Sequence, residues 1–185
     1  MYQFPAAPTS LCIRKTTNIF LLFFGIMWLV AWVASFLILV VIPLETEIRL
    51  VIVAVLMLEI LVLPSILWLL SKQKPLLYEL DVKKLTVKRM KPYRDLEMDL
   101  SRVTSVEARK NYVYTRSPRA RYGNMGVYAV TGLVWNSELG GWLRLALSSE
   151  EDYILLSGDK FGYAVSPQDM DGFMRAAQQE LGISI

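Results

Sequence analysis

Two long apolar runs dominate the first part of the chain, and an alternating pattern of apolar and polar residues replaces them afterwards. The first run, residues 18–42, contains no charged residue, and the second, residues 50–70, contains one, Glu59. About 20 mostly apolar residues are enough to cross a bilayer as a helix. Both runs therefore predict transmembrane helices, joined by a short hairpin at residues 43–49.

The chain after Pro75 carries apolar residues at every second position, which is typical of short strands with one buried face. Turn residues such as Lys91-Pro92 and Ser157-Gly158-Asp159 separate these segments. The predicted strands are residues 77–80, 85–88, 96–100, 103–107, 111–115, 126–131, 142–147, 153–156 and 161–165. This spacing predicts a domain of about seven to nine antiparallel strands.

The end of the chain carries the pattern of an amphipathic helix. Ser166 is the predicted N-cap, Pro167 suits the first helical position, and Asp169 completes a capping box. Gly182 is the predicted end of the helix. The apolar residues of one helical face follow the cap: Met170, Phe173, Met174, Ala177 and Leu181.

Three parts follow from these patterns: a leader at residues 1–17, a transmembrane helical hairpin at residues 18–71, and a strand-rich domain at residues 72–185. Three motifs in the domain stand out, and they begin at Tyr78 (Tyr-Glu-Leu-Asp-Val-Lys-Lys-Leu-Thr-Val), Met98 (Met-Asp-Leu-Ser-Arg-Val-Thr-Ser-Val) and Tyr163 (Tyr-Ala-Val-Ser-Pro-Gln-Asp-Met-Asp-Gly-Phe). The last of them is similar to a strand-into-helix ending of the form S-P-x-D/N-x-x-x-F.

Together these motifs resemble the bacterial membrane proteins that carry a pleckstrin-homology-like (PH-like) domain, over roughly residues 76–182. The resemblance implies a mainly β, PH-like barrel of about seven antiparallel strands, capped by one C-terminal α-helix. It implies a fold rather than an activity, because barrels of this kind host many different ligands.

Charges next to the two apolar runs predict the orientation in the membrane. Arg14 and Lys15 precede the first run, and Lys72 and Lys74 follow the second, whereas the hairpin carries two acidic residues against Arg49. Positively charged flanks stay on the cytoplasmic side. We therefore expect both termini and the domain to be cytoplasmic, at the inner or plasma membrane, with a short hairpin tip outside.

Residues suited to catalysis are scarce. The chain contains no histidine and a single cysteine, Cys12, which excludes Ser-His-Asp and Cys-His nucleophile systems, histidine or thiolate zinc sites, and an internal disulfide. Neither common glycine-rich phosphate-binding motif occurs. The sequence predicts a protein that is not an enzyme and that has no cofactor and no bound metal.

The first candidate site lies within the apolar runs. A charged group in the middle of a bilayer costs about 3 kcal/mol or more unless it is paired or protonated, which makes Glu59 a candidate for contact with a partner. Trp28 and Trp32 are four residues apart and share one helical face. We expect these three residues to make intramembrane contacts. The alternatives are a protonated, purely structural Glu59 and two tryptophans that face lipid.

The second candidate site is a basic docking patch. Residues 72–121 contain fourteen Lys and Arg against six Asp and Glu, a net charge of +8, whereas residues 122–185 contain three against eight, a net charge of −5. The densest basic stretch, interleaved with tyrosines, holds Arg109, Lys110, Arg116, Arg119 and Arg121. Each such residue gains about 1 kcal/mol near an anionic leaflet. Docking on lipid headgroups or on an acidic partner is the prediction, and a solvated loop is the alternative.

These features predict a non-enzymatic accessory or scaffolding subunit of a larger membrane protein complex. The expected partners are membrane lipids and other membrane subunits or further copies of the chain. Nucleic acid is not expected, because no nucleic-acid-binding module accompanies the basic residues. Two alternatives stay open: a stand-alone module that docks on anionic lipid, and a proton-linked channel or transporter subunit that uses Glu59.

Overall fold

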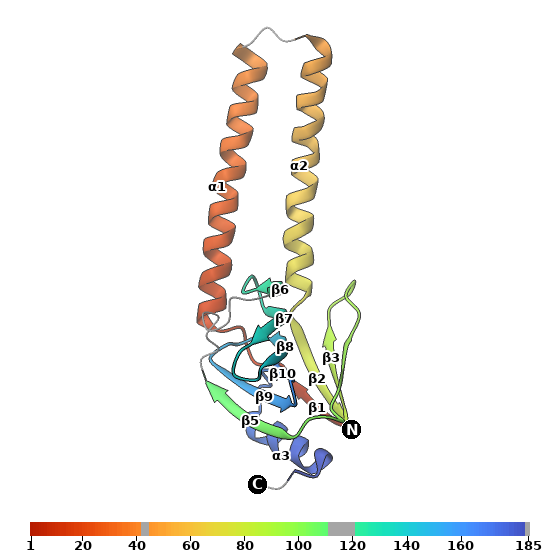
Figure 1. The fold of residues 1–185 in the computed structure, drawn as a ribbon. Coiled ribbons are helices and arrows are strands. Elements are labelled where there is room, and N and C mark those ends of the chain that lie inside the picture. Colours follow the sequence, from red (N-terminus) through yellow and green to blue (C-terminus); the bar gives the residue numbers. More distant parts are fainter. Residues whose placement is uncertain (42–44, 111–120, 184–185) are drawn as a thin grey trace.

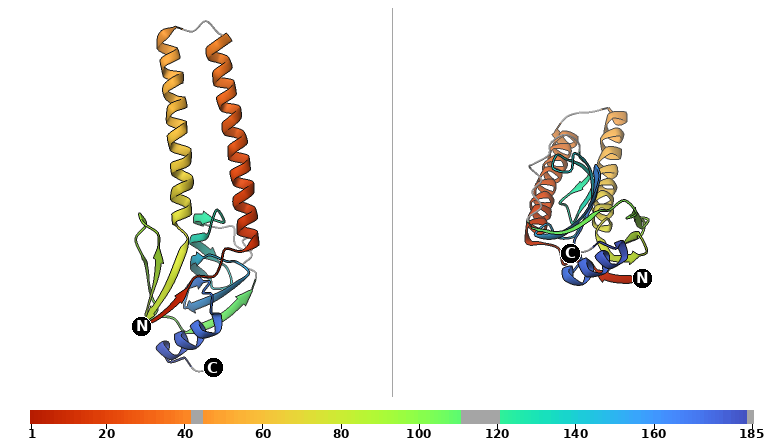
Figure 2. Two further views of the ribbon diagram at one scale, coloured as in Figure 1. Left: turned by 180° about the vertical axis from the view of Figure 1, so that it is seen from behind. Right: turned by 60° about the horizontal axis from the view of Figure 1, so that its bottom comes forward.

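The fold consists of a helical hairpin standing on a mostly β domain (Figure 1). The computed structural model describes residues 1–41, 45–110 and 121–183. The long helices α1 (Leu11–Val41) and α2 (Thr46–Lys72) rise side by side, and the short helix α3 (Met170–Leu181) lies at the far end of the domain. Both termini also lie at that end (Figure 2). The predicted order of two apolar helices, a strand-rich domain and one C-terminal helix is confirmed.

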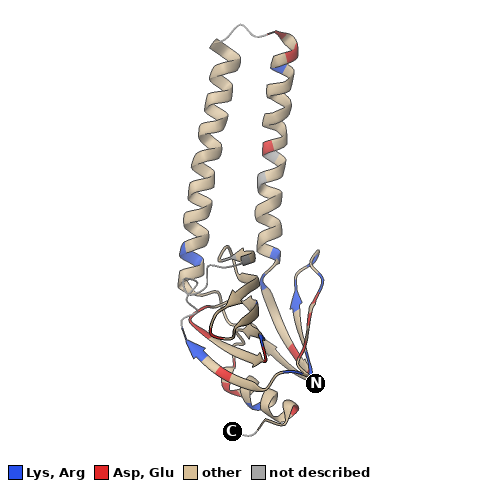
Figure 3. Cartoon of the chain, viewed as in Figure 1, with Lys and Arg blue, Asp and Glu red and all other residues tan. Residues whose placement is uncertain are grey.

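The two long helices have the dimensions of membrane spans. They contain 31 and 27 residues, which at 1.5 Å per residue gives lengths of about 46 and 40 Å against a hydrocarbon core of about 30 Å. Both are long and apolar enough to cross a membrane. Figure 3 shows few charges between the basic residues at the domain end of the helices and the acidic residues near the tip of α2.

One sheet has four antiparallel strands in the order β1-β2-β3-β4. Their bounds are Tyr2–Pro5 for β1, Pro75–Asp81 for β2, Lys84–Arg89 for β3 and Leu96–Asp99 for β4. Residues 2–5 were expected to belong to a separate leader, and they are instead the edge strand of this sheet. The reason is tertiary packing, because the ring of Phe4 contacts that of Phe173 with 5.1 Å between centroids.

The second sheet has six strands in the order β5-β9-β10-β8-β7-β6. Their bounds are Ser105–Lys110 for β5, Arg121–Met125 for β6, Val130–Asn136 for β7, Gly141–Leu147 for β8, Asp152–Gly158 for β9 and Phe161–Val165 for β10. Strand β10 lies between β9 and β8, antiparallel to the first and parallel to the second. Strand β9 therefore does not pair with β8. The chain turns after β9, and β10 pairs with both β9 and β8.

The structure corrects the expected strand arrangement. The described residues form ten strands in two sheets that do not close into a barrel, and one of the strand pairs is parallel. The predicted strand at residues 126–131 is wrong for its first four residues, which form a turn between β6 and β7 with Gly126 and Tyr128 at positive φ of 116° and 65°, whereas residues 130 and 131 begin β7. The predicted strand at residues 111–115 lies outside the described residues.

Two apolar clusters hold the domain together. The larger one lies between the sheets and under α3, and its fully buried side chains include Tyr78, Leu85, Leu156 and Phe173. The second cluster is Ile13, Val130, Val134, Leu143, Leu145, Leu147, Leu155 and Ala164. Because Ile13 belongs to α1, the second cluster packs the first turn of that helix onto the six-stranded sheet.

Helix α3 begins three residues later than expected. Its N-cap is Asp169, whose carboxylate accepts a hydrogen bond from the Gly172 N–H at 2.9 Å, so the prediction of Ser166 as the cap is wrong. Ser166 is fully buried and uses its hydroxyl inside the domain. Gly182 ends the helix in the left-handed conformation, as predicted.

A buried hydroxyl network joins the N-terminal segment to both sheets. The Tyr78 hydroxyl donates to the Ala146 carbonyl at 2.7 Å and accepts from the Ser166 N–H at 3.3 Å. The Ser166 hydroxyl accepts from the Ser148 N–H at 2.8 Å, and the Ser148 hydroxyl donates to the Ala7 carbonyl at 2.6 Å. This network connects four parts of the chain: the segment before α1, strand β2 after α2, and the ends of β8 and β10.

We expect Tyr78→Phe to lower the free energy of unfolding by about 1–3 kcal/mol, because the Ala146 carbonyl and the Ser166 N–H both lose a buried partner. The measurement is thermal unfolding of the full chain in neutral detergent, followed by circular dichroism. Tyr2→Phe is the matched control, since Tyr2 lies at the exposed edge of the same sheet. Equal unfolding temperatures for the two variants would contradict the expected role of the network.

The titration of Tyr78 should make the folded protein less stable at alkaline pH. Burial raises the pKa of Tyr78 to about 12 from its ordinary value of 10.0, against a smaller lowering by hydrogen bonds from Ser166 and Ser148. The folded state therefore holds the phenol proton more tightly, and this stabilisation is complete below pH 10 and is lost as the pH rises to about 12. Across that window the stability difference between wild type and Tyr78→Phe should shrink by about 2–3 kcal/mol. A constant difference would contradict the assignment.

Candidate functional site

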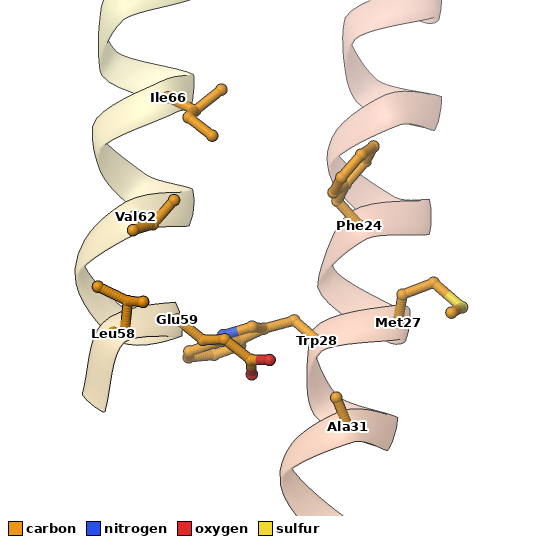
Figure 4. Close-up of a pocket in the computed structure, with 8 residues that line it drawn as sticks. All are labelled: Phe24, Met27, Trp28, Ala31, Leu58, Glu59, Val62 and Ile66. Atoms are coloured by element: carbon orange, nitrogen blue, oxygen red, sulfur yellow. The ribbon is translucent and has the colours of Figure 1, made fainter. Parts of the chain in front are cut away.

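A pocket of about 300 Å³ lies between the two long helices (Figure 4). Its lining residues are Phe24, Met27, Trp28 and Ala31 from α1, and Leu58, Glu59, Val62 and Ile66 from α2. Figure 4 shows Trp28 and Glu59 extending from opposite helices into the space between them. Six of the eight residues are aliphatic or phenyl side chains or methionine, so the pocket is apolar apart from the indole and the carboxyl group.

The polar atoms beside this pocket are not satisfied by the hairpin. The rings of Trp28 and Trp32 lie 6.0 Å apart between centroids, so the two tryptophans share one face of α1, as the spacing predicts. The Trp32 Nε1 and Glu59 Oε2 atoms are both buried, and neither has a hydrogen-bond partner among the residues that the structure describes. A buried polar group without a partner is costly, and this cost rises in hydrocarbon.

Packing between the two helices is sparse. The buried residues of α1 are Ile13 and Thr17, and both lie at its domain end. Among the described side chains of α2, Leu56 is buried, with 7% of its surface exposed. Trp28 is still 36% exposed although it faces the pocket. The hairpin by itself therefore leaves most of its apolar surface uncovered.

The ends of both helices are tied to the turn and strands at β6 and β7. On α1, the Thr17 hydroxyl accepts from the Tyr128 N–H at 2.9 Å and reaches the Gly126 carbonyl at 3.5 Å. After α2, the side-chain amide oxygen of Gln73, Oε1, accepts from the Thr131 hydroxyl at 3.3 Å. The sequence pattern does not indicate these residues, because a single polar residue at the end of an apolar run does not reveal a contact 58 or 111 residues away.

The predicted basic docking patch is only partly described, and its best-placed member is already paired. Arg109 lies in β5 and forms ion pairs with Glu107 at 2.8 Å and Glu138 at 3.3 Å. The Glu107 hydrogen bond is the main reason that the pKa of Arg109 is raised. Arg109 therefore interacts with two carboxylates of its own domain.

The other members of the patch are placed less completely. Lys110 is the exposed last residue of β5, and Arg121 is the first residue of β6, at the opposite edge of the six-stranded sheet. Arg116 and Arg119 lie outside the described residues. Docking through this patch stays a prediction from the sequence.

Comparisons of the chain with protein-family models, curated proteins and solved structures gave no match. Within the described ranges, no group of three or more His, Cys, Asp or Glu side chains is arranged to hold a metal ion.

We expect Thr17→Val to loosen the turn between β6 and β7. The substitution keeps the shape of the side chain but removes the acceptor for the Tyr128 N–H, and a lost hydrogen bond of this kind costs about 1–3 kcal/mol. Hydrogen–deuterium exchange of residues 126–130 should become about tenfold faster or more. Thr16→Val is the matched control, because Thr16 is exposed on the same turn of α1. Unchanged exchange in Thr17→Val would show that this contact does not hold the turn.

Proposed function

We propose that the protein is a non-enzymatic accessory or scaffolding subunit of a larger membrane complex. The α1–α2 hairpin serves as its contact within the bilayer, and the domain lies at the cytoplasmic face. The observation that carries the proposal is the pair of buried polar atoms, Trp32 Nε1 and Glu59 Oε2, that have no partner within the described chain.

The two groups define the chemistry of the contact. The indole N–H is a donor, so it requires an acceptor, and the Glu59 carboxyl group accepts hydrogen bonds and also donates one when it is protonated. Polar side chains that bond across helices in a membrane are worth about 0.6–2 kcal/mol each. A partner helix with a hydroxyl or amide side chain at this depth, which can both donate and accept, would satisfy both groups and cover the pocket.

The junction of hairpin and domain supports a scaffolding role. Ile13 is fully buried in the domain, Thr17 bonds to the turn between β6 and β7, and Gln73 bonds to Thr131 of β7. Because both helix ends are tied to one rigid sheet, a subunit that binds the helices would also set the position of the domain.

The two other candidate functions have less support. Docking on anionic lipid through the basic patch is weakened by the two ion pairs of Arg109. Proton-linked transport rests on Glu59 alone, and two helices do not enclose a pore without further subunits. Both stay predictions from the sequence.

Purification of the native protein in a lipid-preserving polymer, with mass spectrometry of the proteins that accompany it, tests the proposal. We expect other membrane subunits in stoichiometric amounts. Glu59→Ala should lose them, because the substitution removes the carboxyl group from the pocket while it leaves the domain unchanged.

Leu61→Ala is the control for this experiment, since Leu61 lies at nearly the same depth on α2 and is 68% exposed outside the pocket. The control should keep the accompanying subunits. Recovery of the wild-type chain alone, or only as a homo-oligomer, would refute the accessory-subunit proposal. Retention of the subunits by Glu59→Ala would refute the role of Glu59 without refuting the proposal.

A further inference from the structure

A second cavity, of about 400 Å³, lies in the domain directly below α2. Gln73, the C-cap residue of α2, and Pro75, the first residue of β2, both line it. Figures 1 and 2 show the end of α2 lying between the two sheets. The cavity is therefore located where the sheets open toward the helices, at the end of the domain away from α3.

Two arginines line this cavity from opposite sheets. Arg89 belongs to β3 of the four-stranded sheet, and Arg144 belongs to β8 of the six-stranded sheet. None of the described residues that line the cavity is acidic. Burial lowers the pKa of Arg89. The charges of Tyr93 and Asp95 act in the opposite direction, and the positive charge of Arg144, which lines the same cavity, adds a smaller lowering.

The positive charge of the cavity is only partly offset by its surroundings. The carboxylate of Asp95 raises the pKa of Arg89, but Asp95 does not line the cavity and is paired with Lys88 at 2.9 Å. Arg89 bonds through its guanidinium to the Arg94 carbonyl, which is a neutral acceptor. Arg144 has no ion pair or hydrogen bond with any described residue. The carboxyl end of α2 contributes about half a negative charge at most, against two full positive charges.

The depth of the cavity relative to the proposed membrane indicates which anion could reach it. If α2 crosses the bilayer as proposed, its last turn lies among lipid headgroups, where Lys72 stands 5.5 Å above the Trp68 ring. Next to the cavity, Tyr122 is 67% exposed and Trp142 is 37% exposed, with their rings 6.5 Å apart between centroids. Exposed tyrosine and tryptophan side chains are typical of the membrane interface.

We propose that this cavity binds the phosphate of an anionic lipid headgroup, with Arg89 and Arg144 as its ligands. Arginine presents several N–H donors in a planar arrangement that matches phosphate oxygens. The site depends on the membrane placement of α2 and is independent of any partner subunit. It also differs from the basic docking patch, since it uses neither Arg109 nor the residues that follow it.

Thermal unfolding of the full chain in neutral detergent tests the site, with short-chain phosphatidylglycerol, short-chain phosphatidylcholine or inorganic phosphate as the added ligand. A ligand that binds the folded state raises the unfolding temperature. We expect phosphatidylglycerol to raise it more than phosphatidylcholine does. Arg144→Gln should weaken the apparent affinity for phosphatidylglycerol about tenfold or more, the expected loss for one charge-assisted hydrogen bond.

Two further variants make the outcome decisive. Arg175→Gln carries the same change of charge on the exposed face of α3 and should behave as wild type. Arg144→Lys keeps the positive charge and should keep part of the affinity, which also covers the case in which Arg144→Gln does not fold. Equal responses of wild type and Arg144→Gln would overturn the site. A response to inorganic phosphate with none to phosphatidylglycerol would overturn the lipid assignment.

Neither of these results bears on the accessory-subunit proposal, which fails only if no other subunit accompanies the native protein. Conversely, loss of accompanying subunits would leave the lipid response of the detergent-solubilised chain unchanged. The two proposals can therefore fail separately.

Discussion

The buried contact of Tyr78 with Ser166 and with the Ala146 carbonyl is the interaction on which the rest of this structure depends. Tyr78 lies in the first strand after α2, and the Ser148 hydroxyl extends the same network to Ala7, just before α1. The chain thus enters and leaves the hairpin through one buried polar cluster. Because a buried hydroxyl or carbonyl without a partner is costly, the cluster holds only when all its segments are in place.

This buried polar cluster explains how the hairpin is held in place on the domain although its two helices pack sparsely against each other. The helices share little surface with one another, yet Ile13 is buried in the sheet core and Gln73 bonds to Thr131. The domain, rather than contact between the helices, sets their separation. Between helices positioned in this way, the Trp32 Nε1 and Glu59 Oε2 atoms are buried without a hydrogen-bond partner among the described residues.

The two cavities are related through α2. Glu59 lines the pocket between the helices, and Gln73 lines the cavity between the sheets, 14 residues farther along. At 1.5 Å per residue their separation along the helix axis is about 21 Å, more than half the thickness of a hydrocarbon core. Helix α2 therefore carries Glu59 along its length, and its C-cap residue Gln73 lines the cavity that Arg89 of β3 and Arg144 of β8 also line. In the proposed membrane placement, the first position suits contact with a partner helix and the second suits contact with a lipid headgroup.

The sequence by itself determined the features that depend on local pattern. The two long helices follow from apolar length, most strands follow from period-two alternation, and the end of α3 follows from Gly182. Tertiary structure decided what depends on residues far apart in the chain. The packing of Phe4 on Phe173 makes a strand of the expected leader, β10 inserts beside β8, and burial of Ser166 moves the cap of α3 to Asp169. Tertiary structure also pairs Arg109 with Glu107 and places Arg89 and Arg144 around one cavity, because a charge pattern in sequence does not show which side chains the folded sheets bring together.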